Sequence, residues 1–234
     1  MPRLYVVATP IGNLDDLTPR MRWALESASL IAAEDTRVTQ KLLTVMGISR
    51  PLISNHQHNE EARAPRIIER MIAENIDVAV TCDAGTPGIS DPGMELVSAA
   101  WQAGIEVIPV SGPSAVITTL SAAGFDAREF AFYGFLPREN GDLRKKLHAI
   151  AHGPRVAVAY ESPHRIVNLV EQIAREIPGA RVCVCCDLTK KFEKIERGLA
   201  GTVLERLKAN PNVEKGEYCV AIELPEIEEE APAA

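Results

Sequence analysis

Three short segments rich in glycine and proline contain the residue types that small-molecule binding loops use. They span residues 9–14, 83–93 and 111–115. Glycine lets the backbone approach a ligand closely, whereas proline fixes the course of a loop and removes an amide donor. The longest segment also carries Asp83 and Asp91, so it combines close backbone approach with negative charge. This composition predicts rigid cradles for a ligand.

The same segments disfavour two common phosphate-binding sites. Neither the G-x-G-x-x-G pattern of dinucleotide-binding proteins nor the G-x-x-x-x-G-K-[ST] pattern of P-loop proteins occurs in them. A single loop of this kind is usually only a turn. Three such loops at one edge of a sheet favour a ligand site.

Alternating strands and helices must position these loops in the first half of the chain. Short apolar runs predict strands at residues 4–8, 30–33, 51–54, 77–82 and 105–110. Helical spacing predicts helices that start at residue 19 and that span residues 36–46, 60–74, 92–103 and 113–123. This alternation produces a mostly parallel sheet covered by helices, in which ligands bind at the carboxyl ends of the strands.

A polar, turn-rich segment at residues 136–141 joins this half to a second half, in which strands and helices follow a different order. Strands are predicted over residues 130–135, 155–160, 181–187, 192–202 and 217–224, and helices over residues 142–151, 164–177 and 203–209. Because late strands follow one another directly, we expect a mixed sheet. The predicted fold is α/β with a domain at residues 1–120, a second at residues 121–224 and an acidic disordered tail at residues 225–234.

The formal net charge of -7 argues at first against a nucleic-acid partner, because phosphate binding usually leaves a basic footprint. The tail contributes Glu226, Glu228, Glu229 and Glu230 to that charge. Basic clusters remain at residues 138–146 and 190–197. Each is either an anion-binding patch or a solvated face, and the sequence leaves both open.

Composition excludes several other classes of protein. Hydrophobic residues make up 46% of the chain, and no apolar run approaches the ~20 residues needed to cross a bilayer. The chain enters a strand-like run at once, without the zones of a secretory signal, so we expect a cytoplasmic protein that does not bind membranes. The five cysteines lie mostly in apolar runs, which predicts reduced, buried thiols and no metal site.

Five sequence motifs are distinctive in combination. They are YVVATPIGNL at residues 5–14, EDTR at 34–37, DAGTPGISDPG at 83–93, GFLP at 134–137 and ESPHR at 161–165. Together they resemble the RsmI family of the tetrapyrrole methylase superfamily. The resemblance implies a two-domain tetrapyrrole-methylase-like α/β fold that holds S-adenosylmethionine in the cleft between the domains. It also implies methylation of the ribose 2'-hydroxyl of a cytidine in 16S rRNA.

Residue by residue, the resemblance implies a cofactor site built from both domains. Thr86 departs from the broader pattern, in which tetrapyrrole enzymes commonly have aspartate, so the polar contact there should differ. The late strand through Ala221 would offer main-chain groups to adenine. The implied cofactor-binding residues are Pro10, Asp83, Gly85, Thr86, Pro87, Ile89, Ser114, Ala115, Tyr160, Glu161, Leu188 and Ala221.

A ribose hydroxyl is a poor nucleophile while protonated, so a general base within hydrogen-bond reach would help. Candidates for catalysis are Asp35, Asp91 and Glu161, with His56 and Lys191 as further proton acceptors. Asp35 and Arg37 could equally form a structural ion pair, and the segment around His56 could be a plain surface loop. The residues expected to contact RNA are Arg37, His56, Arg144, Lys145, Arg165, Lys190 and Lys191.

Three alternatives share the fold or the cofactor. A tetrapyrrole methyltransferase would need a broad apolar cleft, and a diphthine synthase would lack the TPIGN and SPHR segments. A non-catalytic module would bind S-adenosylmethionine without turnover. The lysine clusters and Thr86 favour RNA. The resemblance also implies a homodimer that acts on 16S rRNA within the small ribosomal subunit.

Overall fold

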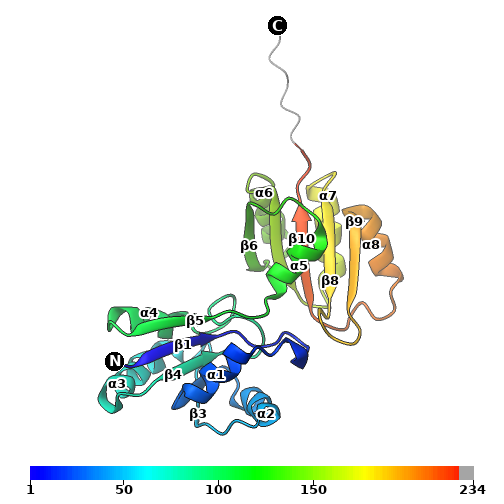
Figure 1. Ribbon diagram of the computed structural model, residues 1–234. Helices are drawn as coiled ribbons and strands as arrows, with labels where there is room; N and C mark the ends of the chain where they lie inside the picture. Colours follow the sequence, from blue (N-terminus) through cyan, green and yellow to red (C-terminus); the bar gives the residue numbers. More distant parts are fainter. Residues whose placement is uncertain (227–234) are drawn as a thin grey trace. The chain divides into compact units, whose positions relative to one another are not determined.

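The computed structural model describes residues 1–226, and residues 227–234, which hold most of the predicted acidic tail, lie outside the described part. The described residues form two compact units, Met1–Ser114 and a second that begins at Ala115 (Figure 1). The sequence prediction put this boundary after residue 120. Helix α5, Ala115–Ala123, lies instead wholly in the second unit, because it packs on that unit's strands.

The first unit is built on a five-stranded sheet in which every pair of neighbours is parallel. The strand order is β3-β2-β4-β1-β5. Strands β2 and β4 are buried at every position, as expected for a sheet covered on both faces. The strands are β1 (Arg3–Val7), β2 (Leu30–Ala33), β3 (Leu52–Ser54), β4 (Val78–Thr81) and β5 (Glu106–Val110).

Four α-helices cover the two faces of this sheet. One apolar cluster joins α1 and α2 to one face, and a second cluster joins α3 and α4 to the other. Capping fixes the boundaries: Thr18 and Asp35 accept main-chain amides at the starts of α1 and α2, and Gly47 ends α2 at a φ of 68°. The helices are α1 (Pro19–Ser27), α2 (Thr36–Met46), α3 (Glu60–Glu74) and α4 (Met94–Gln102), with a 3₁₀ turn η1 at Leu14–Asp16.

The second unit contains a mixed five-stranded sheet of order β6-β7-β10-β8-β9. The β6–β7 pair is parallel and the other pairs are antiparallel, which confirms the predicted mixed sheet. The strands are β6 (Phe130–Phe135), β7 (Val156–Glu161), β8 (Arg181–Cys186), β9 (Lys194–Leu199) and β10 (Tyr218–Glu223). The remaining helices are α6 (Asn140–Ala151), α7 (Ile166–Glu176) and α8 (Ala200–Ala209).

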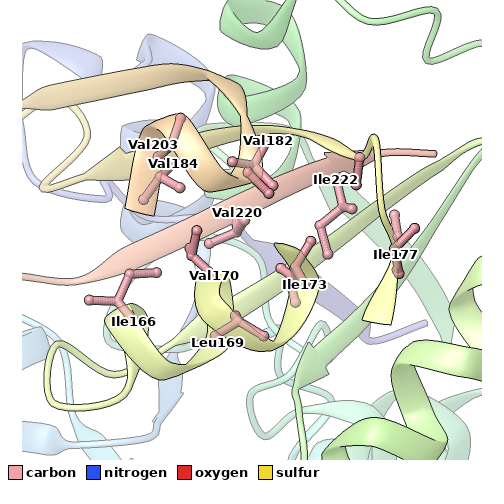
Figure 2. Close-up of a cluster of buried hydrophobic side chains, with 14 of the residues drawn as sticks. Ile166, Leu169, Val170, Ile173, Ile177, Val182, Val184, Val203, Val220 and Ile222 are labelled. Carbon is pink, nitrogen blue, oxygen red and sulfur yellow. The ribbon is translucent and has the colours of Figure 1, made fainter. Parts of the chain in front are cut away.

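The core of the second unit lies between its sheet and helices α6, α7 and α8. Figure 2 shows Val170 and Ile173 of α7 beside Val220 and Ile222 of β10. Strand alternation turns Cys183 and Cys185 to the opposite face, where α5 packs. All five cysteines are free and buried.

Helix α8 begins at Ala200, although the prediction ended the preceding strand at residue 202. The prediction counted the β-branched Thr202 as strand, whereas Ala200, Val203 and Leu204 form one buried helical face. The helices formed by residues 1–226 are all too short or too polar to span a bilayer.

Candidate active site

The three glycine- and proline-rich segments follow β1, β4 and β5, which are adjacent in the sheet. Because parallel strands all point the same way, the segments leave the same edge. The topology therefore brings together the loops that the sequence singled out.

The first two loops are tied directly to each other. Thr9 and Gly85 form an isolated antiparallel bridge with N–H···O distances of 2.8 and 3.0 Å. The hydroxyl of Thr9, which is 2% exposed, also donates to the carbonyl of Cys82 at 3.2 Å. The loops after β1 and β4 therefore form a single rigid piece of backbone.

Glycine is required at several points of this edge for steric reasons. A Cβ on Gly112 would lie 3.0 Å from the Cβ of Ala8, and one on Gly93 would lie 3.1 Å from the Cβ of Pro87. Gly85 and Gly88 both have a φ of +79°. Ser90 adopts a φ of 69°, so the loop after β4 turns sharply back on itself. These contacts describe a preformed, close-packed cradle.

The predicted cofactor residues of the first unit all lie on these loops. Gly85 and Pro87 are buried and form the base of the loop, while Asp83 and Ile89 are exposed. Pro10, Thr86 and Ser114 are half-buried. The predicted cofactor residues of the first unit therefore range from buried to exposed.

An acidic cluster occupies the neighbouring part of the same edge, where β2 and β4 end. The Asp83 amide donates to a carboxylate oxygen of Glu34 at 3.1 Å, and the Asp35 amide donates to a carboxylate oxygen of Asp83 at 3.1 Å. The two loops therefore brace each other. Burial raises the pKa of Glu34, and the bonded Asp83 amide only partly offsets that effect.

Asp91 completes this cluster from the far end of the loop that follows β4. Burial raises its pKa to about 6, and the nearby charges of Glu34 and Asp83 act in the same direction. A carboxylate with a pKa this close to neutrality is a better proton acceptor than an ordinary one. Of the three carboxylates predicted for catalysis, Asp91 has the most suitable surroundings.

Asp35 has the opposite character. Its carboxylate accepts the Arg37 guanidinium at 2.6 Å and caps α2 through the Arg37 amide at 2.8 Å. The side-chain hydrogen bond from Arg37 is the largest of the effects that lower the pKa of Asp35 to about 2. Of the two readings that the sequence left open, the geometry favours the structural ion pair.

Two polar residues at this edge were not predicted from the sequence. Glu34 belongs to the EDTR motif, beside the predicted Asp35. Asn55 follows β3 and is 1% exposed, and neither polar atom of its side chain has a hydrogen-bond partner within residues 1–226. His56 next to it belongs to a local loop, with its ring 3.1 Å from the Asn59 amide nitrogen and 3.2 Å from the His58 amide.

In the second unit, Glu161 ends β7 and forms a buried ion pair. It is 3% exposed and lies 2.5 Å from the Arg165 guanidinium, and it accepts the Ser162 amide at 2.7 Å. Burial raises the pKa of Glu161, while Ser162 and Arg165 oppose that shift. This ion pair gives Glu161 and Arg165 a role in stabilising the second unit. It also makes Glu161 a poor candidate for the general base.

The other predicted residues of the second unit are less uniform. The Tyr160 ring lies 4.9 Å from that of Phe132 and 5.7 Å from that of Phe135. Leu188 is 7% exposed just after β8. Ala221 is buried in the central strand, opposite Val158 on one side and Cys183 on the other, so its main chain belongs to the sheet.

The lysines and arginines predicted to contact RNA differ in whether they form salt bridges within the protein. Lys190 pairs with Glu217 at 2.9 Å and with Asp187 at 3.4 Å. Lys145 pairs with Asp142 at 2.9 Å, and Arg144 is exposed on α6. Lys191 lies 5.6 Å from the ring centroid of the exposed Phe192. Within residues 1–226, no group of three His, Cys, Asp or Glu side chains is placed to hold a metal ion.

Comparison with known proteins defines the class to which this fold and loop edge belong. The family model described as "Tetrapyrrole (Corrin/Porphyrin) Methylases" matches residues 3–204. The chain belongs to this family and, within it, to the ribosomal RNA small subunit methyltransferase I (RsmI) branch, as its curated relatives show.

Proteins named "Ribosomal RNA small subunit methyltransferase I" match nearly the whole chain. The protein from Xylella fastidiosa is 44% identical over 94% of this chain and 81% of its own length. That from Escherichia coli O157:H7 is 42% identical over 97% of this chain and 80% of its own length. That from Bacillus subtilis is 40% identical over 94% of this chain and 74% of its own length.

Solved structures confirm the fold. The methyltransferase CobJ has a TM-score of 0.69 at 21% identity, and the match covers 97% of each chain. Uroporphyrin-III C-methyl transferase from Thermus thermophilus, solved in complex with S-adenyl homocysteine, has a TM-score of 0.61 at 18% identity over 94% of this chain and 97% of its own. At these identities the likeness establishes architecture alone.

Proposed function

We propose that this protein transfers a methyl group from S-adenosylmethionine to the ribose 2'-hydroxyl of a cytidine in 16S rRNA. The observation that carries the proposal is the 40–44% identity, over 94% or more of the chain, to relatives named as small-subunit rRNA methyltransferases. The distant tetrapyrrole enzymes share only 16–21% identity, so they provide no comparable support for a macrocyclic substrate.

The residues of the first unit fit the methyl donor. A Cβ at Gly112 or Gly93 would make tight contacts of 3.0 and 3.1 Å, so glycine lets the loop backbones pack closely into a cradle suited to an adenosyl group. Asp83, which is exposed at this edge, offers negative charge to a cationic ligand. The residues that would hold the donor are Pro10, Gly85, Thr86, Pro87, Ile89 and Ser114, with Ala115, Tyr160 and Leu188 assigned by resemblance. When bound, S-adenosylmethionine supplies an electrophilic methyl group on a sulfonium.

The chain itself has two tasks, alignment and proton removal. The rigid bridge between Thr9 and Gly85 holds one reactant in place, and such positioning contributes up to roughly 7–11 kcal/mol in favourable cases. Asp91 accepts the proton of the ribose hydroxyl, which typically accelerates a reaction about 10²–10⁴-fold. Glu34 is a positioning residue, because its charge adds to the effect of burial in raising the pKa of Asp91 and its carboxylate holds the Asp83 amide.

The RNA substrate is bound by cations at the protein surface. Among the residues predicted to contact RNA, Arg144 and Lys191 are exposed and provide phosphate contacts, whereas Arg37, Lys145 and Lys190 are already paired within the protein. Because the protein as a whole is acidic, we propose that the assembled small subunit in the cytoplasm, with its larger surface, is the substrate. We also propose that the protein acts as a homodimer.

The decisive experiment is to incubate the purified protein with labelled S-adenosylmethionine and small subunits that lack the modification. We expect label on the 2'-oxygen of one cytidine, located by mass spectrometry of nuclease fragments. Label on a base, or no label with subunits and with free rRNA alike, would refute the proposal.

A further inference from the structure

The loop between β8 and β9, residues 187–193, carries an aromatic side chain that is not used in the core. Phe192 is 71% exposed, more than Trp23 or Trp101. The Lys191 ammonium lies 5.6 Å from the centroid of its ring. The flat ring of Phe192 is therefore accessible to a planar ligand.

The loop is held in shape by its own polar groups. The Thr189 amide donates to the Glu193 carboxylate at 2.6 Å, and the Glu193 amide donates to the Lys190 carbonyl at 3.1 Å. Asp187 and Thr189 both adopt left-handed backbone conformations, with φ values of 50° and 65°. Such conformations persist only where the surroundings enforce them. Phe192 is therefore presented by a constrained loop.

A second loop braces the first. The Glu217 amide donates to the Asp187 carboxylate at 3.3 Å, and Lys190 bridges the two acids. Gly216 admits no side chain here, because a Cβ would lie 2.7 Å from a carboxylate oxygen of Asp187. Lys190 and Glu193 therefore make contacts that stabilise the loop itself.

Two cations next to Phe192 remain available. Lys191 and Lys194 are exposed, and within residues 1–226 neither forms a salt bridge. One aromatic ring between two lysines matches the repeating unit of a single strand of RNA, which alternates a flat base with charged phosphates.

A cavity of about 540 Å³ opens next to this loop, between the β8–β9 hairpin and the end of α8. Its lining combines the apolar Ile195 and Leu207 with the polar Lys194 and Asn210 and with Arg206, which pairs with Glu196 at 3.3 Å. This volume is within the usual range for a small-molecule site. The lining suits an aromatic body, and Lys194 is its cation without a salt bridge in the described part of the chain.

We propose that Phe192 stacks against an unpaired base of the rRNA substrate, while Lys191 and Lys194 contact the adjoining phosphates and the cavity receives the neighbouring nucleotide. This inference rests on the proposed function, because it assigns the substrate to a surface of the second unit. Charge and shape both favour single-stranded RNA over a protein partner, which would bring no regular alternation of anions and flat rings.

The test measures binding of a fluorescein-labelled single-stranded RNA of about 12 nucleotides by anisotropy, with the full protein. Phe192→Leu should weaken binding about ten-fold, since stacking on one aromatic is worth about 1–3 kcal/mol. Phe192→Tyr, which keeps the flat ring, should bind within two-fold of the wild type. Lys191→Ala should reduce the slope of log affinity against log salt by about 0.7.

Trp101→Leu is the matched control, because Trp101 is 67% exposed on α4 of the other unit. It should leave RNA affinity unchanged. Equal affinity of Phe192→Leu and wild type, an equal loss in Trp101→Leu, or equally tight binding of a duplex would overturn the inference.

Methylation of small subunits separates this inference from the proposed function. If both hold, Phe192→Leu raises the KM for subunits about ten-fold and leaves kcat and S-adenosylmethionine affinity unchanged. If the wild type methylates subunits and Phe192→Leu does so with the same KM, only the inference fails. If the wild type methylates no RNA at all, the proposed function fails whatever the oligonucleotide shows.

Discussion

The main-chain amide of Asp83 donates to the carboxylate of Glu34 at 3.1 Å and thereby joins the ends of strands β4 and β2. The bond fixes the half-buried Glu34 carboxylate near Asp91, where its charge adds to the effect of burial, the main cause of the raised pKa of Asp91. A main-chain hydrogen bond therefore helps to hold the acidic cluster together. The pKa of Asp91 in this cluster can be tested by mutation.

Asp91→Asn should lower the rate of methyl transfer by about 10²–10⁴-fold while leaving S-adenosylmethionine affinity nearly unchanged. The active form of Asp91 is ionised, so the wild-type rate should rise with pH up to about 6 and level off above it. Rates across pH 5–8 would check this. The control is Asp35→Asn, which preserves a capping side chain and should keep the rate and the pH profile.

Asp91 also makes a prediction about stability. Its pKa in the folded state lies above the ordinary value of 3.8, so its favourable contribution is present below about pH 4 and is lost as the pH rises through about 6. Asp91→Asn should therefore raise the urea midpoint at pH 8 relative to the wild type. The difference should vanish at pH 4, and a destabilised variant at pH 8 would contradict the assigned burial.

Gly85→Leu should abolish S-adenosylmethionine binding in a calorimetric titration, because a side chain there would enter the space beside Ile11 and Pro113. A leucine at a positive φ also costs stability, by about 1–2 kcal/mol. Gly104→Leu controls for that cost, since Gly104 has a φ of +69° with nothing within 4 Å of its would-be Cβ. Loss of cofactor affinity in both variants would mean that strain, not the cradle, is responsible.

Arg165→Met should lower the free energy of unfolding by about 3–5 kcal/mol, because it leaves the buried Glu161 carboxylate without its cation. The loss should shrink at low pH, where the carboxyl group is protonated. Adding Glu161→Gln should restore much of the stability, as urea denaturation would show. Arg37→Met, at an exposed ion pair, should have little effect.

Lys190 and Lys191 should differ sharply despite being neighbours. Lys190→Met removes the bridge to Glu217 and Asp187, so the amides of residues 187–193 should exchange hydrogen faster. Lys191→Met should leave that exchange unchanged and weaken only RNA binding. Similar exchange rates in the two variants would show that Lys190 does not brace the loop.

Local sequence signals were sufficient for most of the fold. Helix α2 was predicted to the residue because Asp35 and Gly47 are strong start and stop signals, and the parallel sheet followed from the strand–helix alternation. Helix α4 begins at Met94, two residues after the predicted start at Pro92. Gly93, with a φ of 132°, continues the preceding loop, as does the bond from the Gly88 amide to the Pro92 carbonyl.

The candidate site could be predicted only in part, because spatial pairing is not encoded in local composition. The loops were found from their glycines and prolines. The partner of Lys190, Glu217, is separated from it by 27 positions, and nothing in the run around Lys190 signals that pairing. Likewise, the contrast between Asp35 and Asp91 depends on which neighbours folding supplies, a cation for one and acids for the other.

The bridge between Thr9 and Gly85 has a consequence for protein synthesis. Strand β1 precedes both of its partners along the chain, because β4 and β5 are complete only at residues 81 and 110. The main-chain amides and carbonyls at the edges of β1 therefore stay unpaired during synthesis until both strands are made, a delay of roughly 5–20 seconds at about 5–20 residues per second. The bridge itself can form only after Gly85 has been added, so the first loop takes its final shape late in the synthesis of this unit.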